Sequence, residues 1–134
     1  MNTINRLVLA LSLLVFSTAG RAEWTEIEKF EDGMRVFVEP GSVQRAGDTA
    51  KVTHLVRWAE PQREPGQPAY LSTKVITAYD CPGKREKYLS SISYAGAMGS
   101  GPRIAVDDNE AEGWDPISES SMEEKLWKVA CKPR

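Results

Sequence analysis

Residues 49–60 form the stretch TAKVTHLVRWAE, and this stretch decides the fold. Every second position belongs to an apolar-leaning set: Val52, His54, Val56 and Trp58. The positions between them are mostly polar: Lys51, Thr53, Leu55 and Arg57. Because successive side chains of a β-strand point to opposite faces, this period of two predicts a long strand with one apolar-leaning face.

The residues before this strand predict a hairpin. Two β-rich runs, 24–30 (WTEIEKF) and 34–38 (MRVFV), are separated by a short segment that ends in Asp32-Gly33. An Asp-Gly pair between two such runs favours a tight hairpin, because glycine tolerates the positive φ that the turn requires. The segment 40–43 (PGSV) then interrupts the strand pattern and predicts a turn before the long strand.

Further strands are predicted after the long one. Residues 61–68 (PQREPGQP) contain three prolines and no apolar side chain, which indicates an exposed loop. The runs 70–81 (YLSTKVITAYDC) and 86–94 (EKYLSSISY) are rich in β-branched and aromatic residues and flank a Pro-Gly turn. A short strand is expected at 103–106, followed by an acidic loop.

The last segment has a helical period. Ser120 and Glu123 form the pattern of a capping box, which marks a helix start. An apolar stripe follows at helical spacing: Met122, Leu126, Val129 and Ala130. Pro133 prevents the helix from continuing. The chain is therefore predicted to be α+β, an antiparallel sheet of about five or six strands packed by a C-terminal α-helix and held by one disulfide.

The N-terminus has the features of a secretory signal. Arg6 precedes an apolar run at 7–16, and the small residues Gly20 and Ala22 follow at the spacing of a signal-peptidase site. We expect a signal peptide at 1–22 and one mature domain at 23–134; the alternative is a retained N-terminal anchor. The apolar run is too short to span a bilayer, and the mature chain does not start with a lipid-attachment cysteine.

The net charge and the cysteine content of the chain exclude some classes of function. The mature chain keeps 15 basic and 19 acidic residues, a net charge of −4, which argues against nucleic acid and anionic membranes as partners. In an exported protein, the pair Cys81 and Cys131 predicts a disulfide. The competing interpretation, a metal site, lacks companion ligands because His54 is the only histidine.

No segment carries the pattern of an enzyme. The stretch 91–102 (SISYAGAMGSGP) has three closely spaced glycines but neither the dinucleotide nor the phosphate-loop spacing, so we expect a turn between strands. His54 lacks a recognisable nucleophile partner and is expected to be a half-buried strand residue. The acidic residues of the loop 107–112 do not have the spacing of an EF-hand calcium loop. We therefore expect their side chains to be hydrated and not to bind calcium. We therefore expect no catalytic residues, no cofactor and no metal.

A small basic cluster remains near the Pro-Gly turn. Lys84, Arg85 and Lys87 could contact an acidic partner, although charges on an exposed turn usually meet only water. Trp114, which precedes the helix, is expected to anchor its loop onto the sheet.

Several motifs, in order, resemble those of one family. They are Glu23-Trp24 at the start of the mature chain, DGMRVFVEPGSV at 32–43, YDC at 79–81, YAGAMGSG at 94–101, EGWDPI at 112–117 and KVAC at 128–131. In this combination the mature chain resembles the surface-adhesin protein E family of small exported bacterial proteins. The resemblance implies an antiparallel sheet packed by a C-terminal helix, with a disulfide matching Cys81 and Cys131.

The resemblance also implies a function. It points to an adhesin that binds host proteins such as vitronectin, laminin and plasminogen and that can form a homodimer. This chain differs in lacking the lipid-attachment cysteine of a surface-anchored member, so both the periplasm and the cell surface or medium remain open as its location.

The resulting prediction is an exported non-enzymatic binding protein. Its expected partner surface comprises exposed strand edges and the loops 61–69, 83–87 and 95–102, with five candidate residues: Lys84, Arg85, Lys87, Tyr94 and Met98. The alternative is a periplasmic structural or small-ligand-binding protein of the cell envelope that has no host partner.

Overall fold

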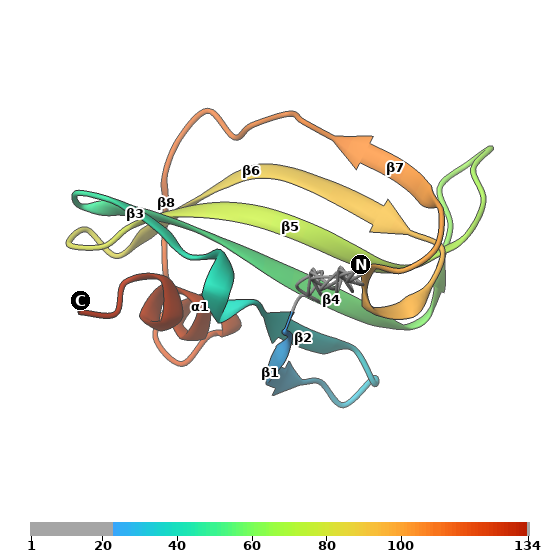
Figure 1. The fold of residues 1–134 in the computed structure, drawn as a ribbon, viewed down its shortest axis with the longest axis horizontal. Helices are drawn as coiled ribbons and strands as arrows, with labels where there is room; N and C mark the ends of the chain where they lie inside the picture. The colour runs from blue at the N-terminus through green and yellow to red at the C-terminus, as the bar shows by residue number, and fades with distance from the viewer. Residues whose placement is uncertain (1–22, 134) are drawn as a thin grey trace, which may run out of the picture.

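The computed structural model describes residues 23–133, and one antiparallel sheet runs through most of this region (Figure 1). The expected signal segment, 1–22, lies outside the described residues. The strands are β1 (Thr25–Lys29), β2 (Arg35–Val38), β3 (Gln44–Ala46), β4 (Thr49–Gln62), β5 (Tyr70–Asp80), β6 (Arg85–Tyr94), β7 (Arg103–Asp107) and β8 (Asp115–Pro116). One helix, α1 (Met122–Ala130), follows them, and two short 3-10 turns, η1 (Pro40–Ser42) and η2 (Ala97–Gly99), lie in the connections.

The predicted long strand is confirmed as β4, the strand that organises the sheet. The sheet order is β1-β2-β4-β5-β6-β7, with β3 also paired to β4 and β8 to β6. The path therefore has six strands, where five or six were expected, and two short strands add to it. The predicted hairpin is also present: β1 pairs with β2, the amide of Phe30 donates to the carbonyl of Met34 (2.8 Å), and Gly33 supplies the positive φ of 94°.

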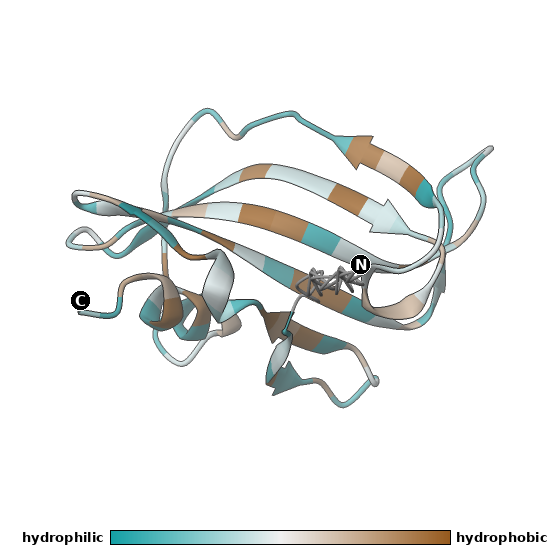
Figure 2. Cartoon of the chain, viewed as in Figure 1, coloured by the Kyte–Doolittle hydropathy of each residue, from teal (hydrophilic) through white to brown (hydrophobic). Residues whose placement is uncertain are grey.

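The main core lies between the sheet and α1, which covers one face of the sheet (Figure 1). Its buried members come from β2, β4, β5, the loop before the helix, and the helix: Val38, Ala50, Val52, Tyr79, Ile117, Leu126 and Ala130. Hydrophobic residues recur along β4, β5 and α1 in Figure 2. The helical stripe predicted from the sequence is thus the surface that packs on the sheet.

The opposite face of the sheet is less polar than the alternation of β4 predicts. Leu55 belongs to the polar set of that strand, yet it is fully buried, and the neighbouring Phe37 is also buried. The cause is η2: Gly99 approaches the Leu55 side chain so closely that an added Cβ would lie 3.4 Å from it. The glycine-rich segment therefore folds back onto the sheet and forms a small second core.

The helix begins one residue later than the capping-box pattern predicts. Ser121, not Ser120, is the N-cap, and its hydroxyl accepts a hydrogen bond from the amide of Glu124 (3.1 Å). Ser120 has a left-handed φ of 59°, whereas the N-cap position requires extended backbone, which Ser121 adopts. Ser121 therefore caps the helix, and the Glu124 carboxylate accepts from the amide of the preceding Ser120 (3.4 Å).

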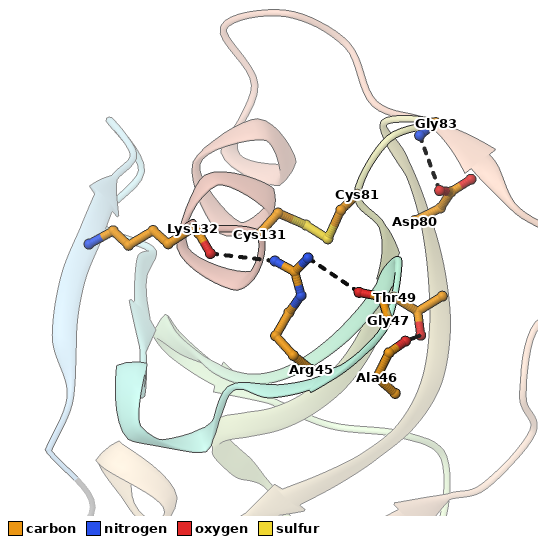
Figure 3. The surroundings of a disulfide bond; sticks show 9 residues. All are labelled: Arg45, Ala46, Gly47, Thr49, Asp80, Cys81, Gly83, Cys131 and Lys132. Atoms are coloured by element: carbon orange, nitrogen blue, oxygen red, sulfur yellow. Dashed lines mark hydrogen bonds between the residues drawn. A yellow bond between two sulfur atoms is a disulfide. The ribbon is translucent and has the colours of Figure 1, made fainter. Parts of the chain in front are cut away.

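The expected disulfide joins the end of the helix to the sheet (Figure 3). Cys81 directly follows β5 and Cys131 directly follows α1, and their Cα atoms are 5.6 Å apart. The Arg45 side chain lies beside the bridge and donates to the carbonyls of Gly47 (3.3 Å) and Lys132 (3.4 Å). Strand β3 and the chain after the helix are thereby linked next to the disulfide.

Candidate functional site

The face of the sheet opposite α1 carries an open hollow. Its volume is about 600 Å³, and it extends from β3 and β4 across β5 and β6 to the loop before β8. Its lining on the sheet includes the apolar side chains of Ile76, Ala78 and Leu89, called the apolar floor below, beside the polar Lys51 and Thr53. Trp114 lines it from the loop before β8. Ile76 remains 38% exposed, which is unusual for a large aliphatic side chain in the middle of a sheet.

The sequence contains a signal for this apolar floor that the search for motifs missed. Val75 and Ile76 are adjacent in β5, so one of them must point to each face of the sheet. A strand with apolar residues on both faces is expected to be covered on both faces or to offer one of them to a partner.

Of the two lysines that line this hollow, Lys87 is paired within the chain, whereas Lys51 forms no ion pair among the described residues. Lys87 lies 3.2 Å from a carboxylate oxygen of Glu110, and both residues line the hollow. The Lys87 ammonium is also 6.0 Å from the centre of the Trp114 ring, within range of a cation–π contact. This contact supports the prediction that Trp114 anchors its loop onto the sheet.

The other two basic residues of the predicted cluster are engaged as well. Lys84 pairs with Glu124 of the helix at 2.5 Å. Arg85 pairs with Asp80 at 2.6 Å, and its hydrogen bond, together with that from the amide of Gly83, holds the pKa of Asp80 below its usual value. The cluster is therefore a set of local ion pairs, not a patch of uncompensated positive charge.

The five predicted partner-surface residues do not gather at one place. Strand β6 begins at Arg85 and ends at Tyr94, so the basic residues and Tyr94 lie at opposite ends of that strand. Tyr94 is only 9% exposed, and its ring is covered by the Lys74 ammonium at 5.1 Å. Met98 lies in η2 with a left-handed φ of 58° and is partly exposed. Contact of these residues with a partner stays a prediction.

The glycine-rich segment is a turn, as expected, and the amides of Gly96, Gly99 and Ser100 are occupied. The amide of Gly99 donates to the Ser72 hydroxyl (2.8 Å), and that hydroxyl donates to the carbonyl of Gly96 (2.6 Å). The amides of Gly96 and Ser100 donate to carbonyls within the turn itself. A phosphate loop needs free amides directed at its anion, so this geometry does not fit one.

His54 is more deeply buried than the sequence suggested. It is only 7% exposed, and burial lowers the pKa of its imidazole to about 4. Its Nδ1 atom has no hydrogen-bond partner, so no carboxylate orients the ring as it would in a catalytic triad.

Other classes of site find little support in residues 23–133. Within this range, no three His, Cys, Asp or Glu side chains are grouped so that they could hold a metal ion. In the acidic loop, Asp107 accepts hydrogen bonds from the amide of Asn109 and the hydroxyl of Tyr88, so its oxygens serve the loop itself. The described part of the chain contains no helix long and apolar enough to cross a membrane.

Comparisons with known proteins agree with this architecture. Protein E from Haemophilus influenzae, in its second crystal form, superposes with a TM-score of 0.67 at 12% identity, covering 85% of this chain and 91% of that chain. Another structure of the same protein gives 0.66 at 12% identity, covering 85% and 87%. Protein E from a non-typeable strain gives 0.62 at 11% identity, covering 85% and 78%.

At such low identity these structures show the shared fold and nothing more. A search of curated proteins finds no match. The family model described as surface-adhesin protein E, however, matches residues 24–132, which is most of the chain. The chain therefore belongs to the surface-adhesin protein E family.

Proposed function

We propose that this protein is an exported, non-enzymatic binding protein that holds a segment of a host extracellular protein against the face of its sheet opposite α1. The single observation that carries the proposal is the hollow with an apolar floor on that face. Exposed apolar surface rimmed by polar groups is typical of sites that contact another protein. Membership of a family described as surface adhesins supports the choice of a host protein as the partner.

The chemistry of the hollow limits the kind of segment it could hold. The Lys87–Glu110 pair and Trp114 form a polar and aromatic rim around Ile76 and Leu89. Such a site suits a loop or strand that presents one or two apolar side chains between polar ones. Because Lys87 and Glu110 are paired and Lys51 is the remaining charge in the lining, we expect binding that is only modestly sensitive to salt.

Surface plasmon resonance with vitronectin, laminin and plasminogen tests the proposal. Wild-type protein is expected to bind at least one of them, and Ile76→Glu is expected to weaken that binding at least roughly tenfold, since it places a charge on the apolar floor. Val106→Glu is the matched control, because Val106 is 56% exposed on β7 and does not line the hollow. Retention of none of the three proteins would refute the host-binding role, and equal loss in both variants would refute the hollow as its site.

Localisation separates this role from the alternative, a periplasmic structural or small-ligand-binding protein. Export depends on the predicted signal peptide at 1–22. Protease added to intact cells should digest a surface protein while periplasmic markers survive. Full protection would favour the periplasmic role and remove host proteins as the natural partners.

A further inference from the structure

A second, smaller cleft of about 210 Å³ lies on the helix-covered side of the sheet, between α1, β5 and β6. Its lining includes three apolar side chains: Val75, Met122 and Leu126. It also includes three carboxylates, which come from β6, β8 and the first turn of the helix: Glu86, Asp115 and Glu123. The pairing of β8 with β6 sets Asp115 directly opposite Glu86.

These three carboxylates have no cation to balance them within the described chain. The basic residues nearest to Glu86 in sequence are engaged elsewhere: Lys84 with Glu124, Arg85 with Asp80, and Lys87 with Glu110. Burial raises the pKa of Glu86 to about 6, and repulsion from Glu123 and Asp115 adds to the effect. The cleft therefore concentrates negative charge at a partly dehydrated place.

A buried polar atom lines the same cleft without a partner. His54 belongs to its lining, and its Nδ1 atom is buried and makes no hydrogen bond. Since the imidazole is uncharged at neutral pH, it adds no positive charge that could satisfy the carboxylates. Buried polar atoms in proteins are almost always hydrogen-bonded, so an unpartnered one in a cleft points to a missing ligand.

We propose that this cleft binds a primary ammonium group carried on a short aliphatic chain. The ammonium offers three N–H donors to the carboxylates and to the imidazole nitrogen. The aliphatic chain lies against the apolar side chains of Val75, Met122 and Leu126. A metal ion fits less well, because no three ligands among the described residues are arranged to hold one.

Binding is expected to depend on pH. The titratable groups that face Glu86 lie on every surrounding element: His54 on β4, Tyr79 on β5, Tyr88 on β6, Asp115 on β8 and Glu123 on α1. Burial raises the pKa of both tyrosines, and it keeps His54 neutral above pH 5. Glu86 therefore accounts for the change between pH 5 and pH 7, and its ionisation should strengthen binding by up to about tenfold.

The test is an NMR titration of the mature protein with two probes, 1,4-diaminobutane and lysine blocked at both its amino and carboxyl ends. Both carry the proposed group, so shifts of the amides around Glu86 and Glu123 are expected with either. Binding of the diamine alone would identify a free amine as the source, and binding of the blocked lysine alone would identify a side chain of another protein. The neutral probe n-butanol is expected to leave these amides unshifted.

Variants locate the site. Glu86→Gln and Glu123→Gln should each weaken binding roughly fivefold or more, since each removes one charge from the cleft. Glu112→Gln is the control, because Glu112 is an exposed carboxylate outside the cleft, and it should bind like the wild type. His54→Leu should also weaken binding while leaving the apolar side chains of the cleft intact.

Three results would overturn the proposal. The first is that neither amine shifts the amides around Glu86 and Glu123, and the second is that n-butanol binds as well as the amines. The third is that Glu112→Gln weakens amine binding as much as Glu123→Gln does, because that would indicate general charge attraction. The inference does not rest on the proposed host-binding role, because its probes are small amines and its variants lie on the opposite face from Ile76.

Discussion

Two ionisable side chains in the same cleft respond to pH in opposite directions. Glu86 has a pKa raised to about 6, so folding favours its protonated form. The stability that Glu86 contributes is fully present below pH 4.5, the pKa of this side chain in the unfolded chain, and it is lost as the pH rises through 6. His54 has a pKa lowered to about 4, so its contribution is complete above 6.5 and is lost as pH falls through 4.

Glu86→Gln is therefore expected to stabilise the protein at neutral pH. The shift would correspond to about 2 kcal/mol for a fully shielded group, and solvent screening of this half-buried side chain reduces the expected gain to about 1 kcal/mol. Urea unfolding at pH 7 and at pH 4 measures it, and the gain should vanish at pH 4. A variant that is less stable than the wild type at pH 7 would contradict the buried-charge argument.

His54 should make the protein sensitive to acid. The lowered pKa predicts that up to about 3 kcal/mol of the free energy of unfolding is lost between pH 7 and pH 4 because of this one residue. The measurement compares Glu86→Gln with the double variant Glu86→Gln/His54→Leu, so that Glu86 cannot mask the effect. Equal pH dependence in the two variants would show that His54 does not titrate in this range.

At the scale of elements, the helix start offers a direct test of the corrected cap. Ser121→Ala removes the side-chain oxygen that accepts from the amide of Glu124 and should destabilise the protein by about 1 kcal/mol. Ser120→Ala is the matched control and should change stability by less than about 0.5 kcal/mol, because its side chain caps nothing. The reverse order of effects, measured by thermal unfolding, would restore the capping box predicted from the sequence.

The glycine-rich turn depends on one buried side chain of β5. Ser72 is fully buried and holds η2 through Gly96 and Gly99, so Ser72→Ala leaves two polar groups of the turn without partners. We expect a loss of about 1–3 kcal/mol and faster hydrogen exchange at the amide of Gly99. Unchanged exchange at Gly99 would mean that backbone contacts alone hold the turn.

These elements show why the fold could be predicted further than the site. The period of two in β4, the Asp-Gly hairpin and the stripe on α1 are local patterns, and each one predicted its element correctly. The burial of Leu55 could not be predicted, because it depends on η2, more than forty positions away in the sequence. The acidic cleft was missed for the same reason, since Glu86, Asp115 and Glu123 come together only through β8 and α1.

At the scale of the whole molecule, the two candidate sites lie on opposite faces of one sheet. The helix gives one face its core, with the small acidic cleft beside it, while the other face keeps the larger apolar hollow. The family match fixes the architecture but does not choose between these faces. Binding measurements on Ile76→Glu and Glu123→Gln distinguish between the two faces, because each substitution changes one face and leaves the other intact.

The disulfide sets how firmly the helix stays on the sheet. It joins residues 50 positions apart, and closing a loop of that length should stabilise the fold by about 4 kcal/mol on the chain-entropy model. A domain of this size has about 5–15 kcal/mol in total, so this share is large. The double variant Cys81→Ser/Cys131→Ser should therefore unfold at markedly lower urea concentration.

Hydrogen exchange in the same double variant shows whether the disulfide stabilises the whole molecule or only the end of the helix. If it constrains the unfolded chain, all amides of β4 and α1 should lose hydrogen-exchange protection together, by the same free energy as in urea unfolding. Loss confined to the residues around Cys131 would show that the bridge only prevents local opening of the helix from the sheet. Equal stability of the variant and the wild type would contradict both roles, because it would mean that packing of Leu126 and Ala130 already holds the helix in place.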